Sequence, residues 1–175
     1  MTEVNAVNAT AAALLGLLHA GPMTGGQLVA AAEERYGAFF SVTRSQVYRE
    51  LPVLAEAGLL RLGARGPRAS QQYVLTPPGR RAFKAWLIAG EGADQLRSPT
   101  ILRILHAGSL TVRQRTALVE RGRLIYAERL ARAEEAVKSA DSSPSATPYA
   151  RAVADFAVAH NRAVLTLLDT VPTGG

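Results

Sequence analysis

The order of secondary-structure signals between residues 14 and 87 constrains the fold more than any other feature of this sequence. Hydrophobic periodicity and turn residues predict three short helices, a strand, a basic turn, a second strand and a fourth helix. The expected helices cover residues 9–19, 24–37, 43–58 and 77–89, and the expected strands cover 59–62 and 71–75. This pattern predicts a mainly α fold with a small β-hairpin.

Two threonines mark the starts of the second and third helices. Thr24 and Thr43 each precede a glutamine by three residues, at Gln27 and Gln46, which is the spacing of a helix capping box. In the third helix, Val47, Leu51 and Leu54 follow a helical period and predict a buried face, with Ser45, Gln46 and Arg49 on the opposite, exposed face. Pro52 should kink this helix because it removes a backbone hydrogen bond.

The turn between the two expected strands carries Arg65 and Arg68 at its tip. The chain has a formal net charge of +6, and residues 35–84 contain nine basic and two acidic residues, a local charge of +7. A local basic excess suits a polyanion, although an arginine-rich solvated surface would have the same composition. Together with the polar face of the third helix, the basic hairpin predicts a winged helix-turn-helix that binds double-stranded DNA.

The expected DNA contacts lie on the third helix and the wing. An arginine side chain can form two hydrogen bonds with guanine, and a glutamine amide can do so with adenine. The capped amino end of the helix favours a phosphate. Tyr48 lies at the border of the buried face, where a core tyrosine and a phosphate contact are both reasonable interpretations. The predicted DNA-binding residues are Thr43, Arg44, Ser45, Gln46, Tyr48, Arg49, Arg65 and Arg68.

The second half of the chain is expected to be helical. Gly90, Gly92 and Ser98-Pro99 mark a linker, so the predicted units are a DNA-binding domain over residues 9–90 and a helical dimerisation domain over 100–171. Helices are expected over 100–106, from Thr111 to near Ser139, and after a loop at 140–147. The last helix carries apolar residues in alternating steps of three and four, which form a narrow seam. This seam comprises Tyr149, Val153, Phe156, His160, Val164, Leu167 and Val171.

The seam needs a partner, which can be the chain's own helix over 111–139 or a second subunit. A palindromic operator requires a twofold axis, so a homodimer is the preferred hypothesis. His160 is interpreted as a satisfied interface histidine, with a pH-sensitive contact as the alternative. Trp86 is expected in core or dimer packing, with a place in an effector pocket as the alternative.

Other chemistries lack support in the sequence. The glycine spacing from Gly21 to Gly26 matches a P-loop, but Gln27-Leu28 replaces the lysine and hydroxyl residue that bind phosphate. His19, His106 and His160 show no ligand spacing, and no carboxylates are paired for acid–base catalysis. We therefore expect no enzyme activity, metal or cofactor. The absence of cysteine, of a long apolar run and of a basic amino-terminal region favours a cytoplasmic protein without membrane contact.

Five segments of the first half together resemble the PadR family of bacterial transcriptional regulators. They are Leu14–Leu18, Gly21–Gly25, Gln46–Leu51, Leu54–Leu59 and Tyr73–Arg81. The resemblance covers about residues 10–90 in the family's order and spacing. The sequence departs from the family's pattern at Gly26, where an aromatic residue is usual, and at Pro52, where a helix former is preferred.

The resemblance implies a winged-helix DNA-binding domain, a helical dimerisation region and, for many members, a repressor released by a small-molecule effector. The resulting hypothesis is a sequence-specific transcriptional repressor that acts as a homodimer on a palindromic operator. The alternative is a winged-helix module that binds protein or RNA.

Overall fold

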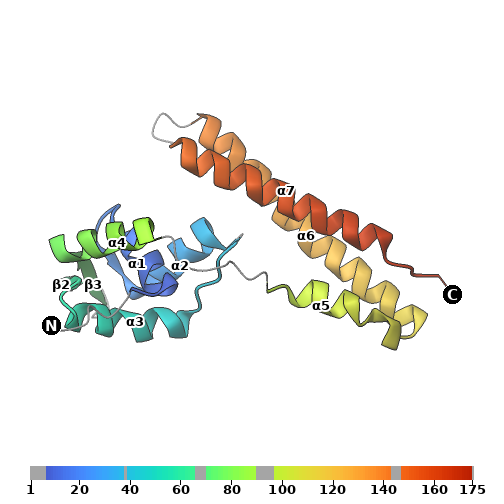
Figure 1. Cartoon of the computed structure of the whole chain (residues 1–175), viewed down its shortest axis with the longest axis horizontal. Helices are drawn as coiled ribbons and strands as arrows, with labels where there is room; N and C mark the ends of the chain where they lie inside the picture. Colours follow the sequence, from blue (N-terminus) through green and yellow to red (C-terminus); the bar gives the residue numbers. More distant parts are fainter. Residues whose placement is uncertain (1–6, 38, 66–69, 90–96, 143–146, 175) are drawn as a thin grey trace. The chain divides into compact units, whose positions relative to one another are not determined.

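The computed structural model describes the chain except for residues 1–6, 38, 66–69, 90–96, 143–146 and 175. The chain divides into two compact units, Met1–Ala93 and Asp94–Gly175. Among the described residues, the first unit holds four α-helices and the strands, and the second holds the remaining helices (Figure 1).

The first unit is built on helix α1 (Ala9–Leu18), which is buried on most of its surface. Leu14, Leu15 and Leu17 are fully inaccessible to solvent. Three helices contact α1: α2 (Gly25–Tyr36), α3 (Arg44–Glu56) and α4 (Pro77–Ala89). The hydrophobic effect of burying this leucine-rich helix therefore holds the other three helices in place.

Tyr36 ties the end of α2 to α1. Its hydroxyl donates a hydrogen bond of 3.4 Å to the Ala13 carbonyl oxygen. Burial raises the pKa of this hydroxyl above its ordinary value, while the nearby charge of Arg35 lowers it by a smaller amount. The neutral phenol is therefore the form that the folded unit favours.

The first unit also contains a three-stranded antiparallel sheet in the order β1-β3-β2. The strands are β1 (Met23–Thr24), β2 (Leu60–Arg65) and β3 (Gln71–Leu75). The mainly α fold with a hairpin is confirmed, but β1 was not predicted from the sequence. Its two residues carry no strand pattern of their own, and they form a strand by pairing with Tyr73 and Gln72.

Strand β2 is longer than the predicted 59–62 because the hairpin contains an irregularity. Leu62 pairs with Tyr73 and Arg65 pairs with Gln71, so β2 has one more residue than β3 between the two pairs. The side-chain amide of Gln71 donates to the Gly63 carbonyl oxygen at 2.9 Å, which stabilises the extra residue. The strand therefore extends as far as Arg65.

The connection from α3 to β2 is fixed by Gly58 and α4. Gly58 has φ +69°, the left-handed conformation expected of a glycine just beyond a helix. The Thr76 hydroxyl lies 2.7 Å from the Gly58 carbonyl oxygen and 2.8 Å from that of Leu59. A Cβ on Gly79 would lie 2.2 Å from the Leu59 oxygen, so this approach requires glycine. The start of α4 thereby positions the root of the hairpin against α3.

The second unit begins with α5 (Pro99–Leu105) and a 3₁₀ turn, η2 (Ala107–Ser109). It continues with the long helix α6 (Val112–Ser142) and ends with α7 (Pro148–Thr170). α6 runs three residues beyond the predicted end near Ser139. Asp141, in this extra segment where a loop was expected, forms an ion pair with Arg151 of α7.

Helices α6 and α7 lie side by side along their length (Figure 1). Their contact uses small and polar positions as well as large ones. The buried residues are Val119, Gly122, Tyr126 and Ala133 of α6, and Ala154, Ala157, Asn161, Val164 and Leu168 of α7. Because a Cβ on Gly122 would lie 2.9 Å from Leu168 Cδ2, glycine allows the two helices to approach closely at this point.

None of the helices in the described ranges combines the length and the apolar character that crossing a bilayer requires.

Candidate DNA-binding surface

The amino end of α3 is fixed by a complete capping box. The Thr43 backbone N–H donates to Gln46 Oε1 at 2.8 Å, and the Gln46 N–H donates to Thr43 Oγ1 at 3.3 Å. The Thr43 hydroxyl also donates to Gln46 Oε1, at 2.9 Å. Ser45 Oγ lies 3.1 Å from Thr43 Oγ1, so its hydroxyl joins the same cluster. The helix therefore starts at a defined point and in a defined direction.

The cap changes what Gln46 offers to a ligand. Pairing with adenine uses both the oxygen and the nitrogen of the glutamine amide. In this structure the oxygen already accepts two hydrogen bonds from Thr43, and no hydrogen bond of Gln46 Nε2 occurs among the described residues. Gln46 can donate to a base acceptor as it stands, but the two-point contact requires it to leave the cap.

Arg49, which was predicted to read a base, is exposed on α3. Its side chain is 69% exposed, and its guanidinium lies 3.5 Å from Glu50 Oε1. Glu50 is buried, and its other oxygen accepts from Asn8 Nδ2 at 3.4 Å. Asn8 in turn caps α1 by accepting from the Ala11 N–H at 2.8 Å. Arg49 is thus connected to the start of α1 through a carboxylate that was not singled out from the sequence.

Tyr48 contacts the first turn of α2. A Cβ on Gly25 would lie 2.8 Å from Tyr48 Cε1, so the ring lies directly against the glycine backbone. The ring is nevertheless 47% exposed, and the Arg44 guanidinium lies 5.5 Å from its centroid. The ring therefore packs against α2 and is still partly accessible, so the contact with Gly25 leaves a phosphate contact of Tyr48 as a prediction.

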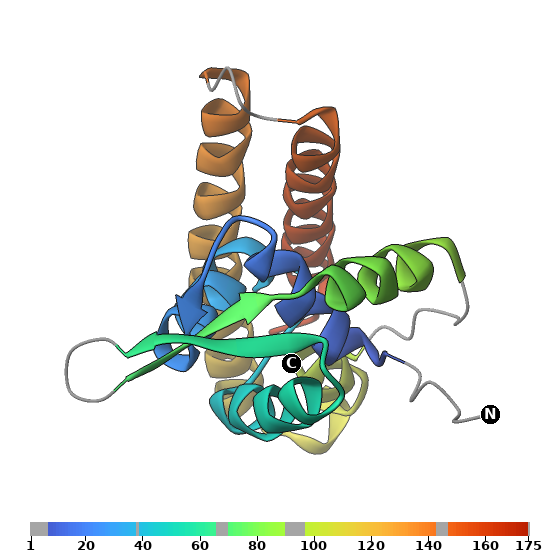
Figure 2. The same ribbon diagram turned by 90° about the vertical axis from the view of Figure 1, so that its left-hand side faces the viewer.

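The wing places Arg65 at the far end of β2, where it is exposed. Figure 2 shows the hairpin extending beyond the helices of the first unit, with α3 running beneath it. β2 also contacts α3 directly. Arg68, the second predicted wing residue, lies outside the described residues. A long basic hairpin beside an exposed helix is a geometry that can contact both a groove and the flanking phosphates.

Seven of the eight predicted DNA contacts lie in the described residues: the Thr43 cap and five residues in the first two turns of α3, and Arg65 on the wing. The sequence did not predict a role in this surface for two residues, Glu50 and Gly25. Both act through contacts with residues distant along the chain, so local spacing carries no signal for them. Across the described ranges there is also no cluster of three or more histidine or acidic residues that could bind a metal ion.

The first unit is a winged helix-turn-helix: α2 and α3 form the helix pair, and the β2–β3 hairpin forms the wing. Residues 14–85 match the Transcriptional regulator PadR-like family. The chain therefore carries a PadR-like domain, and the resemblance found in the sequence is confirmed.

A curated relative supports this assignment. Over 79 residues, which are 43% of this chain and 43% of the relative, the sequence is 34% identical to the negative transcriptional regulator PadR of Bacillus subtilis (strain 168). The matched part thus spans less than half of that relative's length.

Solved structures resemble nearly the whole chain. The crystal structure of Bacillus subtilis PadR in complex with operator DNA matches with a TM-score of 0.73 and 22% identity, over 91% of this chain and 94% of that one. The complex of the same protein with p-coumaric acid matches with a TM-score of 0.65 and 21% identity, over 94% and 95%. At these identities the comparison establishes a shared fold.

Proposed function

We propose that the chain is a PadR-like transcriptional regulator that binds duplex DNA sequence-specifically through α3 and the β2–β3 wing. The observation that carries this proposal is the exposed polar face of α3, held at its amino end by the Thr43 cap, beside a hairpin with Arg65 at its far end. The proposed contacts are Thr43, Arg44, Ser45, Gln46, Tyr48, Arg49, Arg65 and Arg68.

Within this surface the side chains have different roles. Arg49 reads a base edge, because it is exposed and its pairing with Glu50 is long at 3.5 Å. Ser45 lies at the capped helix end, where backbone N–H groups favour a phosphate, and the amide nitrogen of Gln46 donates to a base acceptor. Arg44, Tyr48 and the wing arginines contact the sugar–phosphate backbone, which sets the register of the helix on DNA.

Repression is the proposed direction of regulation. The curated relative is named a negative transcriptional regulator, and a crystal structure of Bacillus subtilis PadR holds operator DNA. A repressor excludes polymerase by occupying its operator, which requires only the binding surface described above.

A homodimer on a palindromic operator is the proposed assembly, with residues 9–90 as the DNA-binding domain and 100–171 as the dimerisation domain. Three residues of the predicted seam, Tyr149, Val153 and Phe156, are 78%, 43% and 57% exposed in the single chain. The chain's own α6 covers a neighbouring face of α7 instead. The exposed apolar residues are therefore free to contact a second subunit.

The rest of the predicted seam is less accessible. Val164 is buried by the chain's own helices, so its contribution is to the α6–α7 core. His160 and Leu167 are half-buried, and the His160 ring stacks on Phe156 at a centroid distance of 6.0 Å. We infer that the subunit contact centres on the amino-terminal half of α7.

A small-molecule effector that releases the operator is the last part of the proposal. It is supported by the PadR complex with p-coumaric acid. Trp86, the residue proposed for an effector pocket, lies on α4 and is 39% exposed, which leaves one side of its ring available. Sites for small molecules are lined predominantly by hydrophobic and aromatic side chains.

The experiment that tests the function is selection of binding sites from random duplex DNA, followed by footprinting and titration at several salt concentrations. We expect a two-part palindrome with half-sites about one helical turn apart, and an affinity that falls with salt. Three results would reject the proposal in favour of an RNA- or protein-binding winged helix. They are duplex binding without sequence preference, binding to RNA alone, and binding to no nucleic acid.

A further inference from the structure

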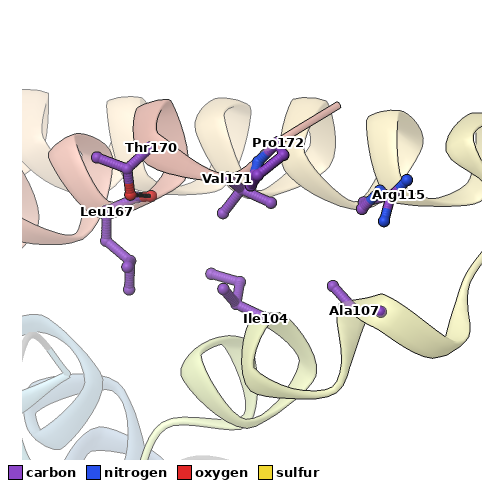
Figure 3. A pocket seen from close by; sticks show the side chains of 8 residues that line it. Ile104, Ala107, Arg115, Leu167, Thr170, Val171 and Pro172 are labelled. Atoms are coloured by element: carbon purple, nitrogen blue, oxygen red, sulfur yellow. Dashed lines mark hydrogen bonds between the residues drawn. The ribbon is translucent and has the colours of Figure 1, made fainter. Parts of the chain in front are cut away.

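The second unit contains a pocket that the DNA-binding surface does not use. It has a volume of about 370 Å³ and lies between α5, the turn η2, the first turn of α6 and the last turn of α7. Figure 3 shows Ile104 and Ala107 on one side and Leu167 and Val171 on the other, with Arg115 at the end of the row. Its walls are therefore mostly apolar.

Arg115 is the only charged residue among those that line the pocket. Its Nε atom is fully buried and has no hydrogen-bond partner. Within the described residues the whole guanidinium forms no ion pair, whereas seven other ion pairs join basic and acidic side chains there. A buried donor without a partner is unfavourable in a folded protein, which suggests that a ligand supplies the missing acceptor.

A purely structural role for Arg115 would be to neutralise the carbonyl groups at the end of α7. The contacts do not support this role, because the Leu167 carbonyl oxygen accepts from Thr170 Oγ1 at 2.7 Å and not from Arg115. Since its hydrogen is used in that bond, Thr170 cannot donate to a ligand. Arg115 is therefore the side-chain donor that the pocket offers.

The position of Arg115 on α6 also suits an anion. It lies in the fourth helical position after the Thr111 cap, where Thr111 and Gln114 form another capping box. The positive end of the helix dipole thus adds to the charge of the guanidinium. A planar guanidinium binds a carboxylate through two parallel hydrogen bonds.

From these observations we propose that the pocket binds a small organic anion, with its carboxylate on Arg115 and its apolar body against Ile104, Leu167 and Val171. The volume accommodates a ligand of one or two rings. Binding at this pocket is measured without DNA, so its failure would leave the proposed DNA recognition untouched.

The test uses the full chain and two probes of equal shape, 2-naphthoate and its uncharged amide 2-naphthamide. Isothermal titration calorimetry should show naphthoate binding with a Kd below about 1 mM, and the amide should bind about tenfold more weakly. Methyl NMR spectra should show naphthoate shifting the signals of Ile104 and Val171. Equal affinity for both probes, no binding of naphthoate, or shifts confined to other methyl groups would overturn the proposal.

Matched variants test whether the charge of Arg115 is the one that binds naphthoate. Arg115→Met should weaken naphthoate binding about tenfold, while Arg113→Met should change it less than about twofold. Arg113 is an exposed arginine in the same helical turn and does not line the pocket, so its loss changes the net charge equally. Arg115→Lys should give an intermediate affinity. An equal loss in the Arg113 and Arg115 variants would attribute binding to general electrostatics and would reject the site.

Circular dichroism of Arg115→Met controls for folding. If this variant loses helix content, the comparison of acid with amide on the unmodified chain and on Arg115→Lys decides the question. An amide that binds as well as the acid in both proteins would then overturn the proposal.

Discussion

Tyr48 of α3 lies against Gly25 of α2 so closely that a Cβ on the glycine would lie 2.8 Å from Tyr48 Cε1. The two residues belong to the two helices of the helix-turn-helix and are 23 positions apart. Their contact sets the distance between the positioning helix and the proposed recognition helix. The residue that makes this possible is glycine, because any side chain would occupy the place of the ring.

The first prediction concerns this contact. Gly25→Ala should lower the free energy of unfolding by about 1–3 kcal/mol, since the new methyl group must displace the Tyr48 ring. Gly26→Ala is the matched control, because it lies next in the same helical turn with nothing within 4 Å of its added Cβ. That substitution should be neutral or stabilising by up to about 1 kcal/mol. Urea unfolding of both variants measures the difference, and equal stabilities would contradict the contact.

The second prediction separates capping from DNA recognition at Gln46. Gln46→Glu retains an acceptor for the Thr43 N–H and favours the helix dipole, so the melting temperature should not fall. The variant loses the amide donor and adds a negative charge facing DNA, so operator affinity should fall by about 1–3 kcal/mol. Gln46→Ala should lower both the melting temperature and the operator affinity. A Gln46→Glu variant with unchanged operator affinity would show that Gln46 serves only as a cap.

The third prediction concerns base readout by Arg49. Arg49→Ala should weaken binding to a selected operator by about 1–3 kcal/mol and relax the preference at one base pair of each half-site. Arg35→Ala is the control, because Arg35 is exposed on the same unit but lies at the end of α2. Its loss should affect specific and nonspecific duplexes equally and weakly. Parallel titrations of operator and scrambled duplexes distinguish these outcomes.

Local signals explain why much of this surface could be predicted from sequence. The Thr43 cap depends on residues three positions apart, and the buried face of α3 depends on the helical period. The contacts of Gly25 with Tyr48 and of Glu50 with Asn8 join residues 23 and 42 positions apart. Spacing along the chain carries no information about such pairs, so only the folded structure reveals them.

The face of α7 was harder to predict for a different reason. The period of its large apolar residues indicated the seam from Tyr149 to Val171, but the chain's own contact with α6 uses Ala154, Ala157 and Asn161. Small residues add little to a hydrophobic pattern, yet they let two helices approach closely. Packing geometry therefore decided which face the chain itself covers, and Tyr149, Val153 and Phe156 of the seam remain exposed.

The fourth prediction concerns the wing. Arg65→Ala should weaken binding to every duplex to a similar extent and reduce the slope of log Kd against log salt by about one. The double variant with Arg68→Ala should reduce it by about two if both residues contact phosphate. Titrations at several salt concentrations measure this slope. An unchanged slope in the double variant would place the wing away from DNA.

The fifth prediction concerns assembly. Phe156 is 57% exposed on α7, whereas Val164, two turns further along, is buried by the chain's own helices. Phe156→Asp should therefore abolish the homodimer and preserve helix content, because a carboxylate is acceptable in solvent but costly in an apolar subunit contact. Val164→Ala should instead lower the free energy of unfolding by about 1–3 kcal/mol and leave the dimer intact.

Sedimentation equilibrium at micromolar concentration, together with circular dichroism, separates these effects. A monomeric Phe156→Asp variant should also lose most of its operator affinity, since a single half-site provides only one recognition helix and one wing. If the unmodified chain is itself monomeric, both the subunit contact and the palindromic operator are wrong. If it is dimeric and Phe156→Asp remains so, the contact lies on another face, and the exposed Leu124 and Ile125 of α6 become the next residues to substitute.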